Sequence, residues 1–261
     1  MTNISNWSIN LLKNDNMARY KWYVLWQRDS EFQTYFALWA TFASCMESRW
    51  KTGSYEEEAN AQRMKMLFIN AQKLDEYDKY LIQLHELIEN AKIAITEKPV
   101  EAEKEYLVAI DNDYKLKAKV DADYWNYMLD HKTVSSFTKE EEQKEKYWQQ
   151  ASLYQYAKYK ATWEKQSIVF CEILKRKAIL PTKKDDLLAM LPTEQRELAL
   201  ESKHKVEDIK NTLYLYTTAD QVSQSISFEW KDTIIPYCED LLRKSILKAN
   251  RLKTLELNDI L

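Results

Sequence analysis

Apolar side chains recur along most of this chain at alternating steps of three and four residues, the spacing that places them on one face of a helix. The clearest case predicts a long helix over residues 15–51 with two adjacent apolar stripes. One stripe holds Trp22, Leu25, Phe32, Phe36, Trp39, Ala43, Met46 and Trp50, and the other holds Tyr35, Leu38, Phe42 and Cys45. Two neighbouring stripes predict a helix that is buried over a wide arc, at the centre of the molecule.

The same spacing predicts further helices, which cover residues 54–96, 99–132, 138–180 and 193 onward, with one short helix in 181–193. Ser54 with Glu57, and Thr138 with Glu141, fit the capping box that opens a helix. Gly53 suits the left-handed position just past a helix end. We therefore expect an all-α fold, an elongated antiparallel bundle of about five long helices plus one short helix, with coiled-coil-like seams.

Composition strengthens the helical prediction, because Gly53 is the one glycine among 261 residues. Average usage would give about 18 glycines in a chain of this length. Tight turns between strands favour residues at positive φ, which glycine adopts most readily. The same scarcity excludes phosphate-binding loops, dinucleotide-binding fingerprints and nucleophile elbows, since each requires glycines at fixed positions.

The expected organisation is a single domain over residues 1–261, with a minor break left open at 181–193, where two of the four prolines lie. The N-terminal residues lack the basic and apolar regions of a signal peptide. The longest uncharged stretch, residues 32–46, is shorter than the roughly 20 residues that span a bilayer. We expect a protein that is cytoplasmic as synthesised, with signal-independent export left open.

Charge gives no indication of a nucleic-acid partner. The formal net charge is −3, and lysines and arginines alternate with acids instead of forming a basic face. Cys45, Cys171 and Cys238 lie far apart among apolar residues, which predicts buried, reduced thiols and not a zinc site.

Metal chemistry in helical bundles most often uses Glu-x-x-His motifs from two helices. The chain offers one such motif, Glu201 with His204, followed by Asp208 on the same helical face, and its polar surroundings favour an exposed surface. His85 and Glu89, one helical turn apart, are interpreted as a polar pair at a helix boundary. We therefore expect no cofactor and no metal ligand.

The densest acidic group comprises Asp111, Asp113, Asp121 and Asp123. On a helix, residues two apart point to different faces, so this group is interpreted as a solvated helix face. His131 follows Asp130 at the expected end of the same helix, where a cation would complement the helix dipole. No catalytic residues are assigned.

Asp29 is the candidate buried polar residue, because it fills a heptad position inside an aromatic-rich run. A buried carboxylate is costly unless it is paired, so Asp29 is expected to pair with a basic side chain and set the register of the bundle. A ligand-binding open end of the bundle and simple exposure stay open as alternatives. The candidate interaction or membrane-facing residues are Phe32, Tyr35, Phe36, Leu38, Trp39 and Phe42.

These features favour a non-enzymatic helical-bundle protein that acts through protein–protein interaction, either with another protein or by self-association through its helix faces. The first alternative is a membrane-active toxin component of the pore-forming type, or a secreted effector, that contacts a membrane without being integral to it. The second is a helical-bundle metalloenzyme. No motif carries a resemblance to a known family.

Overall fold

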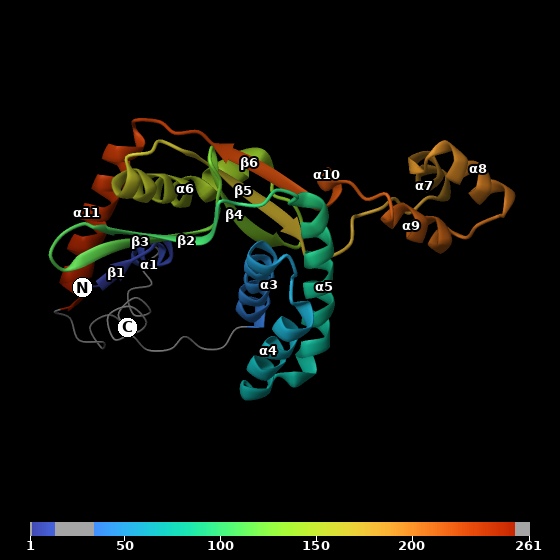
Figure 1. Ribbon diagram of the computed structural model, residues 1–261, viewed down its shortest axis with the longest axis horizontal. Coiled ribbons are helices and arrows are strands. Elements are labelled where there is room, and N and C mark those ends of the chain that lie inside the picture. Colours follow the sequence, from blue (N-terminus) through green and yellow to red (C-terminus); the bar gives the residue numbers. More distant parts are fainter. Residues whose placement is uncertain (1, 14–33, 254–261) are drawn as a thin grey trace.

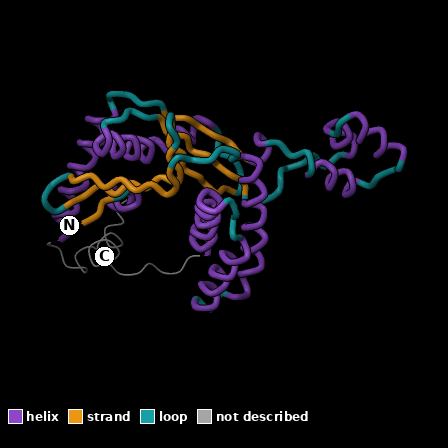
Figure 2. The backbone as a smooth tube through the Cα atoms, viewed as in Figure 1, coloured by secondary structure: helices purple, strands orange, loops and turns teal. Residues whose placement is uncertain are grey.

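The computed structural model describes residues 2–13 and 34–253, and it has a mixed α/β fold (Figure 1 and Figure 2). The six strands of its one sheet are β1 (Thr2–Ile4), β2 (Glu101–Ala109), β3 (Tyr114–Asp123), β4 (Tyr127–Val134), β5 (Ser167–Leu174) and β6 (Ser223–Phe228). The helices are α1 (Asn6–Lys13), α3 (Thr34–Thr52), α4 (Glu57–Asn70), η2 (Leu74–Glu76), α5 (Tyr77–Ala94), α6 (Glu140–Thr162), α7 (Lys184–Met190), α8 (Thr193–Glu201), α9 (Val206–Tyr214), α10 (Ala219–Val222) and α11 (Ile234–Lys253). The predicted all-α bundle with coiled-coil-like seams is therefore wrong.

The largest error concerns residues 99–132, which form strands β2, β3 and β4 instead of one helix. Strand β3 has the two-residue period of a half-buried strand. Its buried positions are Tyr114, Leu116, Ala118 and Val120, and they alternate with Lys115, Lys117 and Lys119. The wider apolar spacing that predicted a helix arises from residues of different strands.

The hairpins form without glycine because other groups close their turns. Asp111 Oδ1 accepts hydrogen bonds of 2.8 Å from the backbone N–H groups of both Asp113 and Tyr114. Positive φ angles are adopted by the non-glycine residues Glu56, Gln72, Glu103, Trp163 and Lys203. Glycine scarcity therefore does not limit the number of turns in this chain.

Three further helical predictions are wrong in part. The helix predicted over 54–96 is divided into α4, η2 and α5. Residues 138–180 form α6 followed by strand β5, and the region from 193 onward contains strand β6 between short helices and α11. The capping boxes are also displaced, since Glu56 and Lys139 occupy the N-cap positions of α4 and α6. Gly53 is confirmed past the end of α3, with φ of +83° and its N–H bonded to Arg49 O at 2.9 Å.

Strand β3 organises the sheet. Strand β2 pairs with it in antiparallel register along one edge. The opposite edge is shared: β1 pairs in parallel with residues 114–116, and β4 pairs antiparallel with residues 122–123. Between these two partners, residues 117–121 face no other strand of the described sheet on that edge. Strand β4 continues in parallel with β5, which pairs antiparallel with β6.

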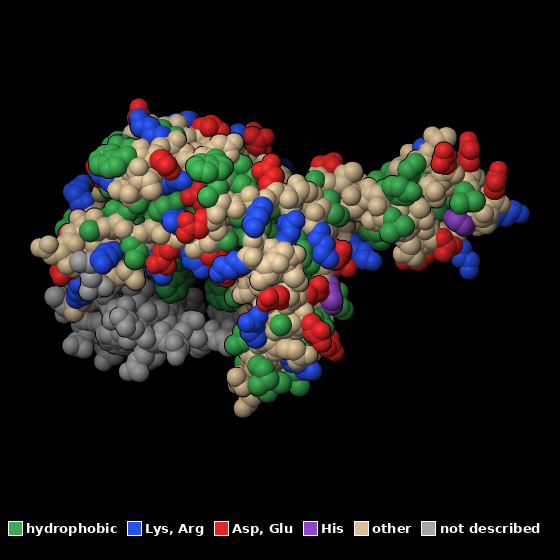
Figure 3. Space-filling view, in the orientation of Figure 1, with side chains coloured by type: hydrophobic (Ala, Val, Ile, Leu, Met, Phe, Trp, Pro, Cys, Tyr) green, Lys and Arg blue, Asp and Glu red, His purple; other side chains and the backbone are tan. Residues whose placement is uncertain are grey.

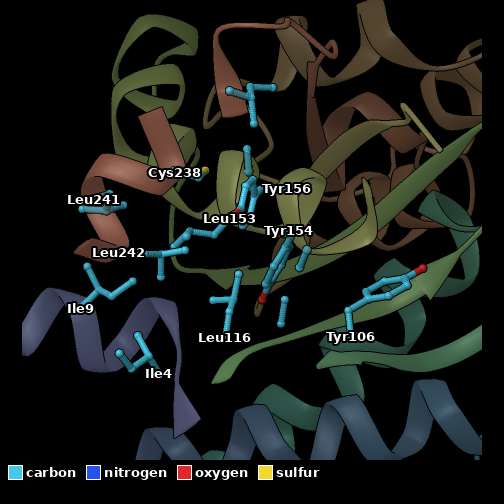
Figure 4. Close-up of a cluster of buried hydrophobic side chains, with 14 of the residues drawn as sticks. Ile4, Ile9, Tyr106, Leu116, Leu153, Tyr154, Tyr156, Cys238, Leu241 and Leu242 are labelled. Atoms are coloured by element: carbon cyan, nitrogen blue, oxygen red, sulfur yellow. The ribbon is translucent and has the colours of Figure 1, made fainter. Parts of the chain in front are cut away.

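Helices cover both faces of the sheet and enclose two hydrophobic cores (Figure 1). The first core joins the sheet to α1, α6 and α11, and Figure 4 shows Leu116, Leu153 and Leu242 meeting within it. The second core joins the other face to α3, α4 and α5 through residues such as Phe42 and Leu84. The predicted burial of the three thiols is confirmed, because all three cysteines are free and buried.

Helices α7, α8 and α9 form a small unit that projects away from the sheet at the end of two connecting segments (Figure 1). The unit has its own cluster of buried residues, which are Leu187, Leu188, Leu191, Ala199, Ile209 and Leu213. The break left open at 181–193 falls where the chain enters this unit. None of the helices in the described part of the chain has the length and apolar character needed to cross a membrane.

Candidate functional site

A cleft of about 570 Å³ opens where β1 and β4 leave the edge of β3 uncovered. Helix α3 and the start of α1 line one side, β3 and β4 line another, and α6 also contributes side chains. Its charged and polar lining side chains include Glu47, Glu103, Lys117, Lys119, Asp121, Asp130, Lys132, Gln150 and Tyr154. The cleft therefore gathers groups from segments more than 100 residues apart.

Two carboxylates line the cleft just beyond the point where β3 and β4 separate. The last paired residues are Ala122 with Leu129, and Asp121 and Asp130 are the next residues along the two strands. The charge of Asp121 acts to raise the pKa of Asp130, so the two carboxylates lie within electrostatic range of each other. Asp130 is 3% exposed and the Asp121 side chain is 13% exposed, so both lie at the inner end of the cleft.

Asp121 is held through one of its two oxygens. Asp121 Oδ2 accepts a 2.7 Å hydrogen bond from the backbone N–H of His131 and lies 3.0 Å from His131 Nδ1. Burial acts to raise the pKa of Asp121, but the hydrogen bonds from His131 and the nearby charges of His131 and Lys132 hold it below the usual value. Asp121 is therefore a carboxylate at neutral pH.

Asp130 has a less complete set of partners. Asp130 Oδ1 forms an ion pair with the Lys132 ammonium but makes no hydrogen bond of good geometry. Asp130 Oδ2 lies 3.5 Å from Gln150 Nε2, which also donates to Tyr154 Oη at 2.7 Å. Burial raises the pKa of Asp130 to about 6, and Asp121 adds to the rise while Lys132 opposes it.

His131 holds the two strands and the second core together. It is 3% exposed, its ring stacks on Trp50 at 5.4 Å, and it meets Phe42 edge-on at 6.2 Å. Because the ring is enclosed in this way, Nδ1 is kept directed at Asp121. The expected role of His131 as a cation at a helix end is wrong, since it lies within strand β4.

Glutamates and lysines surround the acidic pair. Glu103 lies within β2 but is skipped in the pairing of β2 with β3, and its φ is 54°. Its carboxylate forms an ion pair with Lys119. Lys117 pairs with Glu105 at 2.6 Å, and Glu47 of α3 pairs with Lys51. The outer cleft thus carries both signs of charge, as does the surface in Figure 3.

The inner cleft contains carboxylate oxygens, which are the ligands that hard divalent cations take. Within the described ranges, no group of three or more His, Cys, Asp or Glu side chains is gathered closely enough to hold a metal ion. Mg²⁺ does not need such a cage, because it commonly binds through one or two carboxylates, with water and substrate phosphates completing its shell. The two carboxylates here are Asp121, whose Oδ2 is bonded to His131, and Asp130, whose Oδ1 is paired with Lys132.

The residues selected from the sequence are dispersed. Tyr35, Phe36 and Trp39 are exposed on α3, whereas Leu38 and Phe42 are buried, and Trp39 lines the cleft. Asp29 and Phe32 lie outside the described residues. The Glu201–His204 and His85 motifs lie away from the cleft, and His85 contacts Glu57.

Sequence reasoning missed the central residues, Asp121, Asp130 and Lys132. A signal was present: an alternating strand ends near Asp121, and Asp130-His131-Lys132 follows nine residues later. Both Asp121 and the Asp-x-Lys segment were assigned to a helix, and on a helix these residues do not face one another.

Comparisons with known proteins give limited help. No protein-family model matches the sequence. No curated protein matches it either. Among solved structures, the chain resembles one from Eubacterium rectale named "Putative exonuclease", with a TM-score of 0.51 and 13% identity over 100% of this chain and 83% of that one. At that identity the likeness shows a shared α/β fold and nothing more.

Proposed function

We propose that this protein is a metal-dependent nuclease that hydrolyses phosphodiester bonds in the cleft at Asp121 and Asp130. The observation that carries the proposal is that two buried carboxylates, Asp121 of β3 and Asp130 of β4, line one cleft, with Lys132 paired to Asp130. The name of the structural neighbour, "Putative exonuclease", adds support.

The residues have separate roles in such a reaction. A divalent cation held by Asp121 and Asp130 would polarise a phosphate oxygen and lower the pKa of a bound water. Lys132 brings an ammonium group next to Asp130, where it stabilises the charge that builds up on the phosphate. Gln150 holds Asp130 in place through its links to Asp130 and Tyr154.

The bond changes are those of simple hydrolysis. The water oxygen forms a bond to phosphorus and gives up one proton to solvent, the P–O bond to the leaving nucleotide breaks, and the leaving alkoxide takes up one proton from solvent. The reaction needs no glycine-rich phosphate loop, so it is compatible with the composition of this chain.

This proposal departs from the expectation of a non-enzymatic protein with a protein partner and no nucleic acid. A net charge of −3 disfavours a nucleic-acid partner only where binding depends on a basic face, and a bound cation supplies positive charge locally. The interaction-module and toxin hypotheses stay predictions that nothing in the fold tests.

The proposal is tested by incubating purified protein with end-labelled oligonucleotides in Mg²⁺, Mn²⁺ or EDTA. We expect cleavage with either cation and none in EDTA. Asp121→Asn, Asp130→Asn and Lys132→Ala should each reduce the rate by about 100-fold or more. Asp186→Asn, an exposed acid on α7, is the matched control and should cleave like the wild type.

Two results would refute the proposal. One is the absence of any metal-dependent cleavage by folded wild-type protein. The other is equal cleavage by wild type and Asp130→Asn, which would indicate a contaminating nuclease. Calorimetric titration with Mn²⁺ provides a readout that is independent of activity, since Asp130→Asn should weaken binding and Asp186→Asn should not.

A further inference from the structure

The cleft contains aromatic side chains as well as charges. Trp39 of α3 and Trp7 of α1 line it and are 42% and 47% exposed. Ala40, Ala43 and Ser44 also line it, so small residues of α3 leave space beside the Trp39 ring. Exposed tryptophan rings beside such a space are typical of surfaces on which nucleic-acid bases stack.

The β3 side of the cleft offers contacts for phosphates. Lys117 and Lys119 lie two residues apart on the uncovered edge of β3, which corresponds to about 6.6 Å along a strand. Each lysine already pairs with one glutamate, Glu105 and Glu103 respectively. An ammonium group has three donors, so one ion pair leaves donors for a phosphate oxygen.

The depth of the acidic pair restricts the form of the substrate. Asp130 is 3% exposed at the inner end of a cleft that is bounded by α3 and α1 on one side and by β3 on the other. A scissile phosphate must pass between these elements to reach it. In a duplex the bases are paired and stacked within the helix, so they cannot stack on Trp39 until the strand is separated.

We infer that the cleft accepts single-stranded nucleic acid, with the phosphates along Lys117 and Lys119 of β3 and a base stacked on Trp39 of α3. This inference rests on the proposed nuclease function and specifies its substrate. An aromatic ring on which a base stacks, beside side chains that contact the backbone phosphates, is the general mode by which proteins bind single strands without reading their sequence.

Binding is measured separately from cleavage, by fluorescence anisotropy of a labelled 12-nucleotide DNA in EDTA with full-length protein. The same oligonucleotide as a blunt duplex is the comparison, and we expect tighter binding of the single strand. Trp39→Ala should weaken single-strand binding by roughly 5- to 150-fold, the range for the loss of one base–aromatic stack. Trp125→Ala, at a 90% exposed tryptophan outside the cleft, is the matched control and should bind like the wild type.

A second series tests the contacts of Lys117 and Lys119 with phosphates. The double variant Lys117→Ala/Lys119→Ala should weaken binding and flatten its dependence on salt concentration, because fewer counterions are released. Lys165→Ala, a lysine outside the cleft, should leave the salt dependence unchanged.

The outcomes separate this inference from the proposed function. Metal-dependent cleavage of duplex and single strand at equal rates, with Trp39→Ala as active as wild type, would overturn the inference and leave the nuclease proposal standing. Tighter binding of the duplex would overturn it as well. Absence of cleavage and of binding for either substrate would overturn both.

Discussion

Two buried carboxylates on adjacent strands of this sheet have opposite surroundings. Glu172 of β5 has a fully buried side chain and accepts hydrogen bonds from Thr138 N, Thr138 Oγ1 and Tyr147 Oη at 2.8–3.0 Å. Asp130 of β4 is almost as buried, but its partners are the Lys132 ammonium, which forms an ion pair with Oδ1, and Gln150 Nε2, which lies 3.5 Å from Oδ2. Glu172 therefore has the more complete set of hydrogen bonds.

The pKa values follow from this difference. Burial acts to raise the pKa of Glu172, but its hydrogen bonds and the Lys146 ammonium hold the pKa below the usual value. Burial raises the pKa of Asp130 to about 6. A buried carboxylate with a raised pKa and few hydrogen-bond donors is more frequent at functional sites than elsewhere. The comparison therefore contrasts an acid whose hydrogen bonds are supplied by the fold with the acid that the proposal assigns to the cleft.

The largest expected effect contrasts the two acids in catalysis. Asp130→Asn should lower metal-dependent cleavage by about 100-fold or more, because a ligand of the cation is lost. Glu172→Gln should leave the rate per folded molecule within a factor of about 3. Steady-state cleavage assays, corrected for the folded fraction by circular dichroism, measure both. Similar losses of cleavage rate in both variants would contradict the assignment of different roles to Asp130 and Glu172.

The second effect is on stability, where we expect the Glu172 variant to be affected more than the Asp130 variant. Glu172→Gln should lower the free energy of unfolding by about 2–4 kcal/mol, since hydrogen bonds to a buried charged acceptor are weakened. Urea unfolding at neutral pH measures the change. Asp130→Asn should cost much less, because it removes a buried charge that is poorly satisfied.

The stability contributed by Glu172 depends on pH. Its folded pKa lies below the ordinary value of 4.5, so the folded state holds fewer protons than the unfolded state near that pH. The contribution is therefore complete above about pH 5 and is lost as pH falls through the folded pKa. Unfolding curves between pH 7 and pH 3 should show wild type and Glu172→Gln converging toward the acid end. A constant gap would contradict the assignment.

A third, smaller effect concerns His131, which we expect to position Asp121. His131→Leu should raise the Mn²⁺ concentration for half-maximal cleavage by about 10-fold, because Asp121 Oδ2 loses its contact with the imidazole ring and keeps only the backbone N–H. His131→Asn retains a donor close to the position of Nδ1 and should restore much of the loss. If the two variants need the same Mn²⁺ concentration for half-maximal cleavage, His131 contributes through packing alone.

The smallest effect is expected at Thr138. Thr138→Val removes one hydrogen bond to Glu172 and keeps the shape of the side chain, so it should cost about 1 kcal/mol of unfolding free energy. Cleavage should not change. A loss of activity here would show that the Glu172 cluster and the cleft are coupled.

The sequence predicted helices best where the helical pattern is local. The helix that ends before Gly53, and the glycine itself, were predicted correctly within the described residues of α3. The wide buried arc was not, since Tyr35, Phe36 and Trp39 are exposed. The strands were missed in part because the Asp111 side chain closes the turn between β2 and β3, where a turn prediction depends on glycine. The alternation of lysines with apolar residues in β3 indicates a strand, and this pattern should have outweighed the wider helical spacing.

The sequence by itself determined the helix that ends before Gly53, the burial of the thiols and the exclusion of glycine-dependent phosphate loops. Only the tertiary structure decided the candidate site. Asp121 and Asp130 line one cleft because β3 gives one edge to both β1 and β4, and residues 117–121 between them have no partner strand there in the described sheet. Strand pairing depends on contacts between distant segments, so the residue spacing alone did not reveal which acids would face each other.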